Sequence, residues 1–202
     1  MRSGQRAVRV LAGIAALWMM VGLVSCNNRC DDLTVPPSET SEYVLPYPVG
    51  KTAVLFMTYC SRRGHENRLA YDFQMPMGAQ ICASRGGVVV EVQNDFHDDD
   101  HTTGHNNRVV VKHDDGSLAW YGHLQYKSAA VAVGDTVGQG QVIGLCGTSG
   151  RSGNVPHVHF EVFKRRKYDY GDAIPISFRN LKGRVDSRGV LIQHEEYTAL
   201  AY

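Results

Sequence analysis

The sequence predicts an all-β domain built of antiparallel strands with little helix, and three observations support that prediction. Short runs of β-branched and aromatic residues recur from residue 49 onward, such as residues 88–92 (VVVEV) and 118–124 (LAWYGHL). Glycine-bearing turns separate these runs, and the Asp-Gly pair within residues 114–117 is typical of a hairpin. No segment has the spacing of apolar residues expected of an amphipathic helix. Short strands joined by such turns predict a sandwich or a closed barrel.

The expected strands follow one another closely along the chain. They cover residues 53–57, 69–73, 81–83, 88–92, 108–113, 118–124, 131–137, 140–144, 157–163, 174–178 and 190–193. The polar residues 94–107 separate two of these strands and contain His97, His101 and His105. Because this stretch lacks the spacing of a strand or a helix, we expect a solvated loop there rather than a second metal site.

The first 25 residues have the pattern of an export signal. Three arginines precede an apolar run at residues 10–24, which is shorter than the roughly 20 residues that a membrane-spanning helix needs. The run ends at Leu23-Val24-Ser25-Cys26, which resembles a bacterial lipobox, so Cys26 is expected to carry a lipid. An uncleaved anchor or a plain signal peptide remains the alternative. Residues 26–47 are polar and contain prolines, which predicts a flexible tether between lipid and domain.

Charge and cysteine content narrow the possible partners. The net charge is +1, so the sequence carries no basic footprint for nucleic acid. Apart from Cys26 there are four cysteines, none in a CxxC pair, which argues against a cysteine zinc site. An exported chain can form disulfides, and these four cysteines allow three pairings or none: Cys30, Cys60, Cys82 and Cys146.

Residues 157–163 (HVHFEVF) hold the pattern with the clearest chemistry. Side chains two apart on a strand share a face, so His157 and His159 are expected to point the same way, roughly 6–7 Å apart. Val158 and Phe160 then point into a core. Two imidazoles on one rigid face can divide metal binding and proton transfer between them. A solvent-facing strand that happens to carry two histidines is the alternative.

Four blocks in one order resemble a known family. They are residues 72–78 (DFQMPMG), 113–124 (HDDGSLAWYGHL), 133–144 (VGDTVGQGQVIG) and 147–162 (GTSGRSGNVPHVHFEV). Together they are similar to the lysostaphin-type, or LytM-like, zinc endopeptidases, which cut peptide cross-links in peptidoglycan. The resemblance covers about residues 69–162 and implies that family's antiparallel sheets, arranged as a sandwich or open barrel.

The resemblance also implies roles for four residues. Asp72 and His159 match zinc ligands, whereas His157 and His123 match catalytic histidines beside a bound water. One Zn²⁺ per chain is expected, since catalytic zinc takes nitrogen and oxygen ligands, keeps a position open for water and lowers the pKa of that water. Which histidine moves which proton stays open, and His113 is expected to be structural.

One position departs from the family's first motif, HxxxD. Arg68 stands four residues before Asp72, and arginine cannot deprotonate to become a ligand. We expect His65 to take the vacant position, because a polar loop with Gly64 can follow a sharp path. The alternatives are a weak or absent metal with two protein ligands, or a third ligand drawn from Glu66, His97, His101 or His105.

The resulting interpretation is a membrane-anchored lipoprotein of the bacterial cell envelope, on the periplasmic side if the cell has an outer membrane. Residues 48–165 would form the zinc endopeptidase domain, and residues 166–202 a C-terminal β extension. The domain would hydrolyse stem or cross-link peptides of peptidoglycan. A degenerate, zinc-free member that only binds or activates is the main alternative. A carrier-like β module is disfavoured, because no lysine lies in a matching turn.

Overall fold

The computed structural model describes residues 30, 33–62, 64–165 and 167–202. The expected signal peptide at residues 1–25 and the expected lipidation site Cys26 lie outside these residues. Within the described ranges, no helix is long and apolar enough to cross a membrane.

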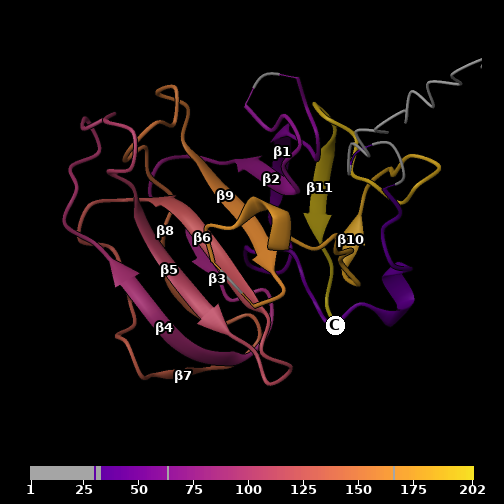
Figure 1. Cartoon of the computed structure of the whole chain (residues 1–202), viewed down its shortest axis with the longest axis horizontal. Coiled ribbons are helices and arrows are strands. Elements are labelled where there is room, and N and C mark those ends of the chain that lie inside the picture. Colours follow the sequence, from indigo (N-terminus) through magenta and orange to yellow (C-terminus); the bar gives the residue numbers. More distant parts are fainter. Residues whose placement is uncertain (1–29, 31–32, 63, 166) are drawn as a thin grey trace, which may run out of the picture.

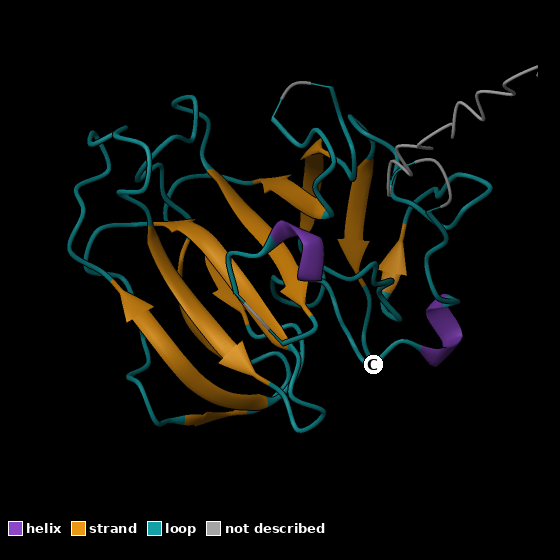
Figure 2. Ribbon diagram, viewed as in Figure 1, coloured by secondary structure: helices purple, strands orange, loops and turns teal. Residues whose placement is uncertain are grey.

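The architecture is nearly all β, as the sequence predicts (Figure 2). A nine-stranded antiparallel sheet has the order β10-β11-β1-β2-β9-β6-β5-β4-β7, and a two-stranded sheet pairs β3 with β8 (Figure 1). Two 3-10 turns, Ser38–Thr40 and Tyr170–Asp172, are the only helical segments among the described residues. The strands are β1 (Thr52–Met57), β2 (Ala70–Gln74), β3 (Gln80–Cys82), β4 (Gly87–Gln93), β5 (Asn107–Lys112), β6 (Leu118–Leu124), β7 (Thr136–Val137), β8 (Val142–Leu145), β9 (His157–Phe163), β10 (Leu181–Lys182) and β11 (Glu196–Ala199).

Alternation along the central strands gives the large sheet one apolar and one chemically active face. On β9, Val158 and Phe160 belong to the hydrophobic core, together with Tyr121 from β6. Ile81 and Ile143 of the small sheet are buried in the same cluster. His157 and His159 alternate with these apolar residues and therefore lie on the opposite face.

Strand register brings distant residues together on that face. β2 and β9 are antiparallel neighbours, and Asp72 lies directly opposite His159. β6 borders β9 on its other side, where Gly122 is the partner of His159. His123, next along β6, has a φ of +59°, in the left-handed region, and the pairing of β6 with β5 shifts register at this point. The centre of the sheet thus holds residues from three strands.

The structure differs from the expected flexible tether over residues 33–47. Apolar side chains of this segment are buried in the main core, and each such burial stabilises the fold by about 1.5–3 kcal/mol. The backbone N–H of Val44 also donates to the carbonyl of Ser84, at 2.8 Å. The polar residues and prolines around them hid this packing. The buried apolar residues are Leu33, Val35, Tyr43, Val44, Leu45 and Tyr47, and residues 43–47 are buried without a break.

Two expected late strands are wrong. Residues 174–178 and 190–193 form no named strand, and β10 and β11 lie elsewhere. The apolar residues that suggested these strands serve the core instead, since Ile176, Phe178 and Val190 are all buried. The cysteine pairing left open by the sequence is also resolved, with a Cys30–Cys60 disulfide and buried free thiols at Cys82 and Cys146.

Candidate metal centre

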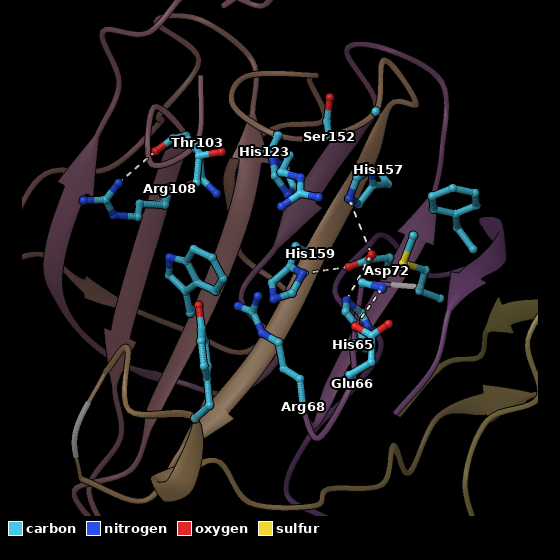
Figure 3. A pocket seen from close by; sticks show the side chains of 18 of the residues that line it. His65, Glu66, Arg68, Asp72, Thr103, Arg108, His123, Ser152, His157 and His159 are labelled. Atoms are coloured by element: carbon cyan, nitrogen blue, oxygen red, sulfur yellow. Dashed lines mark hydrogen bonds and ion pairs between the residues drawn. The ribbon is translucent and has the colours of Figure 1, made fainter. Parts of the chain in front are cut away.

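A groove of about 920 Å³ runs over the polar face of the central strands, and the site residues expected from the sequence line it. In Figure 3 the side chains of His123, His157 and His159 converge on Asp72 from one side, and His65 approaches from the other. The five residues come from three strands, β2, β6 and β9, and from the loop between β1 and β2. All five are buried.

Three of these residues form a compact group of potential ligands. His65, Asp72 and His159 each offer one ligand atom, and the three atoms lie within 4.8 Å of one another. His159 Nδ1 is 2.8 Å from Asp72 Oδ1, and His65 Nε2 is 3.2 Å from Asp72 Oδ2. No other group of three or more histidine, cysteine or acidic residues with such spacing occurs in the part of the chain that the structure describes.

The loop between β1 and β2 carries His65 into the site through its own hydrogen bonds. The backbone N–H of Cys60 donates to the carbonyl of Arg68 at 2.9 Å, which closes the base of the loop. The N–H of His65 donates to the carbonyl of Ser61 at 3.3 Å. Gly64, just before His65, has a φ of +116°, a conformation that favours glycine. A histidine seven positions from Asp72 therefore reaches the same carboxylate.

Backbone carbonyls fix the tautomers of three histidines. The Nδ1 atoms of His65, His123 and His157 lie 3.1, 2.8 and 2.7 Å from the carbonyl oxygens of Thr58, Ser149 and Val155, respectively. A carbonyl oxygen can only accept, so each Nδ1 donates its N–H and each Nε2 keeps a lone pair. For His65, that lone pair faces the Asp72 carboxylate.

This donor set fits a metal cation. A lone pair that faces a carboxylate is unfavourable unless a cation or a proton lies between the two groups. Asp72 Oδ1 also has no hydrogen-bond donor among the described residues, although it is buried and 2.8 Å from a ring nitrogen of His159. Imidazole nitrogens and a carboxylate oxygen are ligands that zinc accepts. Direct contacts among His65, Asp72 and His159 leave lone pairs facing lone pairs. A bound cation would satisfy all three groups.

The electrostatics of the site separate charged from neutral groups. Burial raises the pKa of the Asp72 carboxyl, but the neighbouring imidazoles, led by His157, outweigh burial and hold that pKa well below its usual range. Burial acts to lower the pKa of His65, and the Asp72 carboxylate outweighs it, so this pKa is raised. Burial lowers the pKa of His123 to about 3 and also lowers the pKa of His157. His123 and His157 are therefore neutral at neutral pH.

The other residues weighed as a third ligand lie elsewhere in the structure. Glu66 is exposed and accepts a hydrogen bond from the N–H of Gly64 at 3.2 Å. The histidines of the long loop at residues 94–106 make local contacts instead: His97 stacks on Tyr126, His105 Nδ1 is 2.8 Å from Asp100 Oδ2, and His101 Nδ1 is 3.3 Å from the carbonyl oxygen of Gly150.

Sequence reasoning missed Glu161 as a residue of this site. It follows His159 by two positions on β9, so the same alternation that pairs the histidines places it on their face. Its side chain is fully buried, Oε2 is 2.7 Å from Arg68 Nη2, and Oε1 has no partner among the described residues. The period-two pattern already available in the sequence could have identified it.

Comparison with known proteins gives this arrangement a family. The profile of peptidase family M23 matches residues 66–170, just over half of the chain. The chain belongs to peptidase family M23. This confirms the resemblance to lysostaphin-type peptidases that the sequence motifs indicate. The matched range includes Asp72, His123, His157 and His159, and begins one residue after His65.

Several named relatives are similar to the M23 part of the chain. Peptidoglycan DD-endopeptidase ShyA of Vibrio cholerae is 34% identical over 125 residues, which cover 59% of this chain and 27% of ShyA. Glycyl-glycine endopeptidase ALE-1 of Staphylococcus capitis is 35% identical over 95 residues, covering 47% of this chain and 24% of ALE-1. The aligned stretch therefore spans only about a quarter of the length of these curated relatives.

Solved structures are also similar in part. The catalytic domain of lysostaphin from Staphylococcus simulans matches with a TM-score of 0.47 and 27% identity, over 62% of this chain and 87% of that domain. A zinc containing peptidase from Vibrio cholerae matches with a TM-score of 0.46 and 27% identity, over 60% of this chain and 37% of that protein.

Proposed function

We propose that this M23 protein is a zinc-dependent endopeptidase that hydrolyses peptide bonds in the stem or cross-link peptides of bacterial peptidoglycan. The observation that carries the proposal is the convergence of His65, Asp72 and His159, with their ligand atoms within 4.8 Å. Those three residues would hold one Zn²⁺. When bound, the ion would polarise the scissile carbonyl and make water a nucleophile near neutral pH.

The two remaining histidines are proposed to move protons. His123 and His157 lie side by side, with ring centroids 4.6 Å apart, and both keep Nε2 unprotonated because Nδ1 donates to a backbone carbonyl. A neutral Nε2 can accept a proton from water, and the imidazolium so formed can donate it to the departing amine. Either histidine could serve each step, and the fixed Nδ1–H bonds keep both rings in place for it.

The shape and lining of the groove support a peptide substrate. The groove is open, and aromatic side chains form part of its wall: Phe56, Trp120, Tyr168 and Tyr170. An extended chain laid across such a groove would present one peptide bond to the histidines. Relatives named for peptidoglycan DD-endopeptidase and glycyl-glycine endopeptidase activity support peptidoglycan peptides as the substrate class.

The main rival is a degenerate member that binds peptidoglycan without metal. A protein that has lost its metal is no longer selected to keep the ligands. This chain nevertheless keeps four residues that match the family's ligands and catalytic histidines, and all four line one groove: Asp72, His123, His157 and His159. Arg68 stands at the position where the family usually has a histidine ligand. His65 supplies an imidazole at the metal centre in its place. A full set of donors with fixed tautomers favours the enzyme.

A lipid anchor at Cys26 would place this activity at a membrane of the cell envelope. The motif Leu23-Val24-Ser25-Cys26 supports the anchor. Four residues after Cys26, Cys30 is bonded to Cys60. Four extended residues span at most about 14 Å, so the anchored domain would act close to the membrane surface.

The test is metal content and cleavage of purified peptidoglycan by the full chain. We expect about one zinc per chain, release of peptide fragments, loss of that release with a chelator, and recovery on addition of zinc. Zinc-free protein with full activity would overturn the metal mechanism. Zinc-loaded protein with no cleavage of any peptidoglycan would favour the binding protein.

A further inference from the structure

Arg68 and Glu161 form a buried ion pair at the edge of the metal centre. Glu161 Oε2 accepts a hydrogen bond from Arg68 Nε at 2.8 Å and lies 2.7 Å from Arg68 Nη2 in an ion pair. The glutamate side chain is 0% exposed and the arginine side chain 18% exposed. Removal of either partner would leave a buried or half-buried charge without compensation, which is strongly unfavourable. The pair is therefore a fixed part of the groove wall.

The same carboxylate oxygen also faces a proposed metal ligand. His159 Nε2 lies 3.4 Å from Glu161 Oε2. With Arg68 donating to that oxygen and ion-paired with it, the carboxylate is ionised and can only accept, so the proton of the His159 ring belongs on Nε2. The lone pair then belongs on Nδ1, the nitrogen that lies 2.8 Å from Asp72 Oδ1.

Aromatic rings hold Arg68 in this position. Its guanidinium carbon lies 4.3 Å from the centre of the Tyr170 ring and 5.5 Å from that of Trp120. Trp120 in turn makes an edge contact with the His159 ring, with centroids 4.7 Å apart. Figure 3 shows Arg68 reaching up beside His159. Stacking, the Nε hydrogen bond and the ion pair with Glu161 restrict the planar guanidinium far more than a lysine would be restricted.

We propose that Glu161 is the positioning residue of His159 and that Arg68 acts through Glu161. Glu161 fixes the ring so that Nδ1 faces Asp72 and the metal, while Arg68 fixes Glu161. Glu161 also offsets the positive charge of Arg68, which would otherwise repel a divalent cation beside it. The proposal rests on the proposed function only in needing the metal at His65, Asp72 and His159.

This role explains how the chain can carry an arginine at position 68. Arg68 is not itself a metal ligand. It binds the Glu161 carboxylate, which in turn orients the proposed ligand His159. Outer hydrogen-bond partners of metal-bound histidines orient the ring and raise its basicity, and their loss typically weakens metal binding 10–100-fold.

The test is zinc affinity of the full chain, measured by competition with a chelator. We expect Glu161→Gln to weaken zinc binding about 10–100-fold. Arg68→Lys keeps the charge but loses the forked geometry, so it should weaken binding by less. Because Arg68 acts through Glu161, the double variant Arg68→Met with Glu161→Gln should bind zinc no more weakly than Glu161→Gln alone.

A matched control is available in the same wall of the groove. Arg108 Nε lies 2.7 Å from Glu91 Oε1, in an arginine–glutamate pair that contacts no proposed ligand. Glu91 also accepts hydrogen bonds from Lys167 Nζ and Tyr168 Oη. Glu91→Gln weakens this cluster, and because none of its members contacts a proposed ligand, zinc affinity should stay within about twofold.

A second readout separates positioning from mere structural support. In the zinc-loaded wild type, the His159 Nε2–H should give a hydrogen-bonded proton resonance protected from exchange with water, and Glu161→Gln should shift that resonance or speed its exchange. A structural role alone would lower the thermal midpoint of the metal-free chain and leave zinc affinity unchanged.

Equal zinc affinity in wild type and Glu161→Gln, or strictly additive losses in the double variant, would overturn the proposal. A wild-type chain that binds no zinc would overturn it together with the metal mechanism. A wild type that binds zinc with the expected dependence on Glu161, yet cleaves no peptidoglycan, would overturn the proposed substrate and leave the positioning pair standing.

Discussion

His65 Nε2 lies 3.2 Å from Asp72 Oδ2, although seven positions separate the two residues in the chain. His65 lies in a loop that is closed at its base, where the Cys60 N–H donates to the carbonyl of Arg68, four residues before Asp72. His65 ends up pointing inward with its Nδ1–H bonded to Thr58 and its Nε2 toward the carboxylate. This geometry makes His65 a candidate metal ligand beside Asp72.

Replacement of His65 should remove a metal ligand. We expect His65→Ala to weaken zinc binding by more than the about 10–100-fold that loss of an outer hydrogen-bond partner costs, and by about as much as Asp72→Ala. Chelator competition on the full chain measures this. Glu66→Ala is the matched control, since Glu66 adjoins His65 but is exposed, and zinc affinity should stay unchanged. Wild-type affinity in His65→Ala would remove His65 from the site.

The four site histidines should fall into two classes. His159→Ala should lose zinc and activity together, because Nδ1 of this ring belongs to the ligand group. His123→Ala and His157→Ala should keep most of the zinc and lose about 10²–10⁴-fold in kcat, the usual contribution of a general acid or base. Zinc content and kcat measured on the same samples separate the classes. Loss of zinc in His157→Ala with zinc retained in His159→Ala would reverse the assignment of the two histidines on β9.

Much of this site follows from local pattern, and the rest depends on tertiary structure. The period of two along β9 is enough to place His157 and His159 on one face. The contact between His159 and Asp72 depends on which strands become neighbours, which only the register of β2 and β9 determines. The position of His65 depends on loop closure by backbone hydrogen bonds, which residue type does not reveal.

The fold, too, was predictable in part from local sequence pattern. The central strands were predictable because β-branched and aromatic residues lie between clear turns. The strand expected at residues 174–178 was wrong because Ile176 and Phe178 are buried without joining a sheet ladder. The segment at residues 33–47 looked like a tether because polar residues and prolines outnumber its core contacts, such as Leu45, which is completely buried. Apolar character therefore reported burial in both cases, but not the backbone conformation.

Acid should destabilise the metal-free protein through the buried histidines whose pKa is lowered, and His113 offers a clean test away from the groove. Burial lowers the pKa of His113, whose Nδ1–H donates to the carbonyl of Gly86 beside Arg85, Asp114 and Asp115. Above the unfolded-state pKa of about 6.5, both states are neutral and this stability is fully present. Below it the unfolded state takes up a proton that the folded state resists, so stability falls as pH falls, by up to about 1.4 kcal/mol per pH unit and histidine.

Denaturant unfolding of the metal-free chain at pH 7.5 and at pH 5.5 measures this effect. We expect His113→Gln to lose less stability than wild type over that interval, because glutamine does not titrate. His65, His123 and His157 contribute equally to both proteins and cancel in the comparison. Identical pH dependence in the two proteins would show that His113 takes up a proton as readily in the folded state as in the unfolded state.

The Cys30–Cys60 disulfide should stabilise the domain and its metal loop. The bond links two positions 30 residues apart, and closing such a loop in the unfolded chain is worth about 3–4 kcal/mol. The double variant Cys30→Ser with Cys60→Ser should lose about that much in the free energy of unfolding. A reductant should lower wild-type stability similarly and leave the double variant unaffected, because Cys82 and Cys146 are free thiols. Equal stability of oxidised and reduced wild type would contradict this.

Lipidation at Cys26 should decide where the protein resides, without altering its chemistry. The described residues begin to pack at Leu33, and Cys30 is bonded to Cys60, so an acyl chain at Cys26 would hold the whole domain at the membrane. Wild type should partition into detergent, and Cys26→Ser should either partition into the aqueous phase or retain its signal peptide, with zinc content unchanged once folded. Because the proposed metal ligands are His65, Asp72 and His159, any loss of zinc in that variant would indicate misfolding rather than a role of Cys26 in the site. Mass spectra of the membrane-derived protein that show no thioether-linked acyl chain at Cys26 would contradict the lipid anchor. The proposed peptidase activity would be unaffected, since it rests on His65, Asp72 and His159.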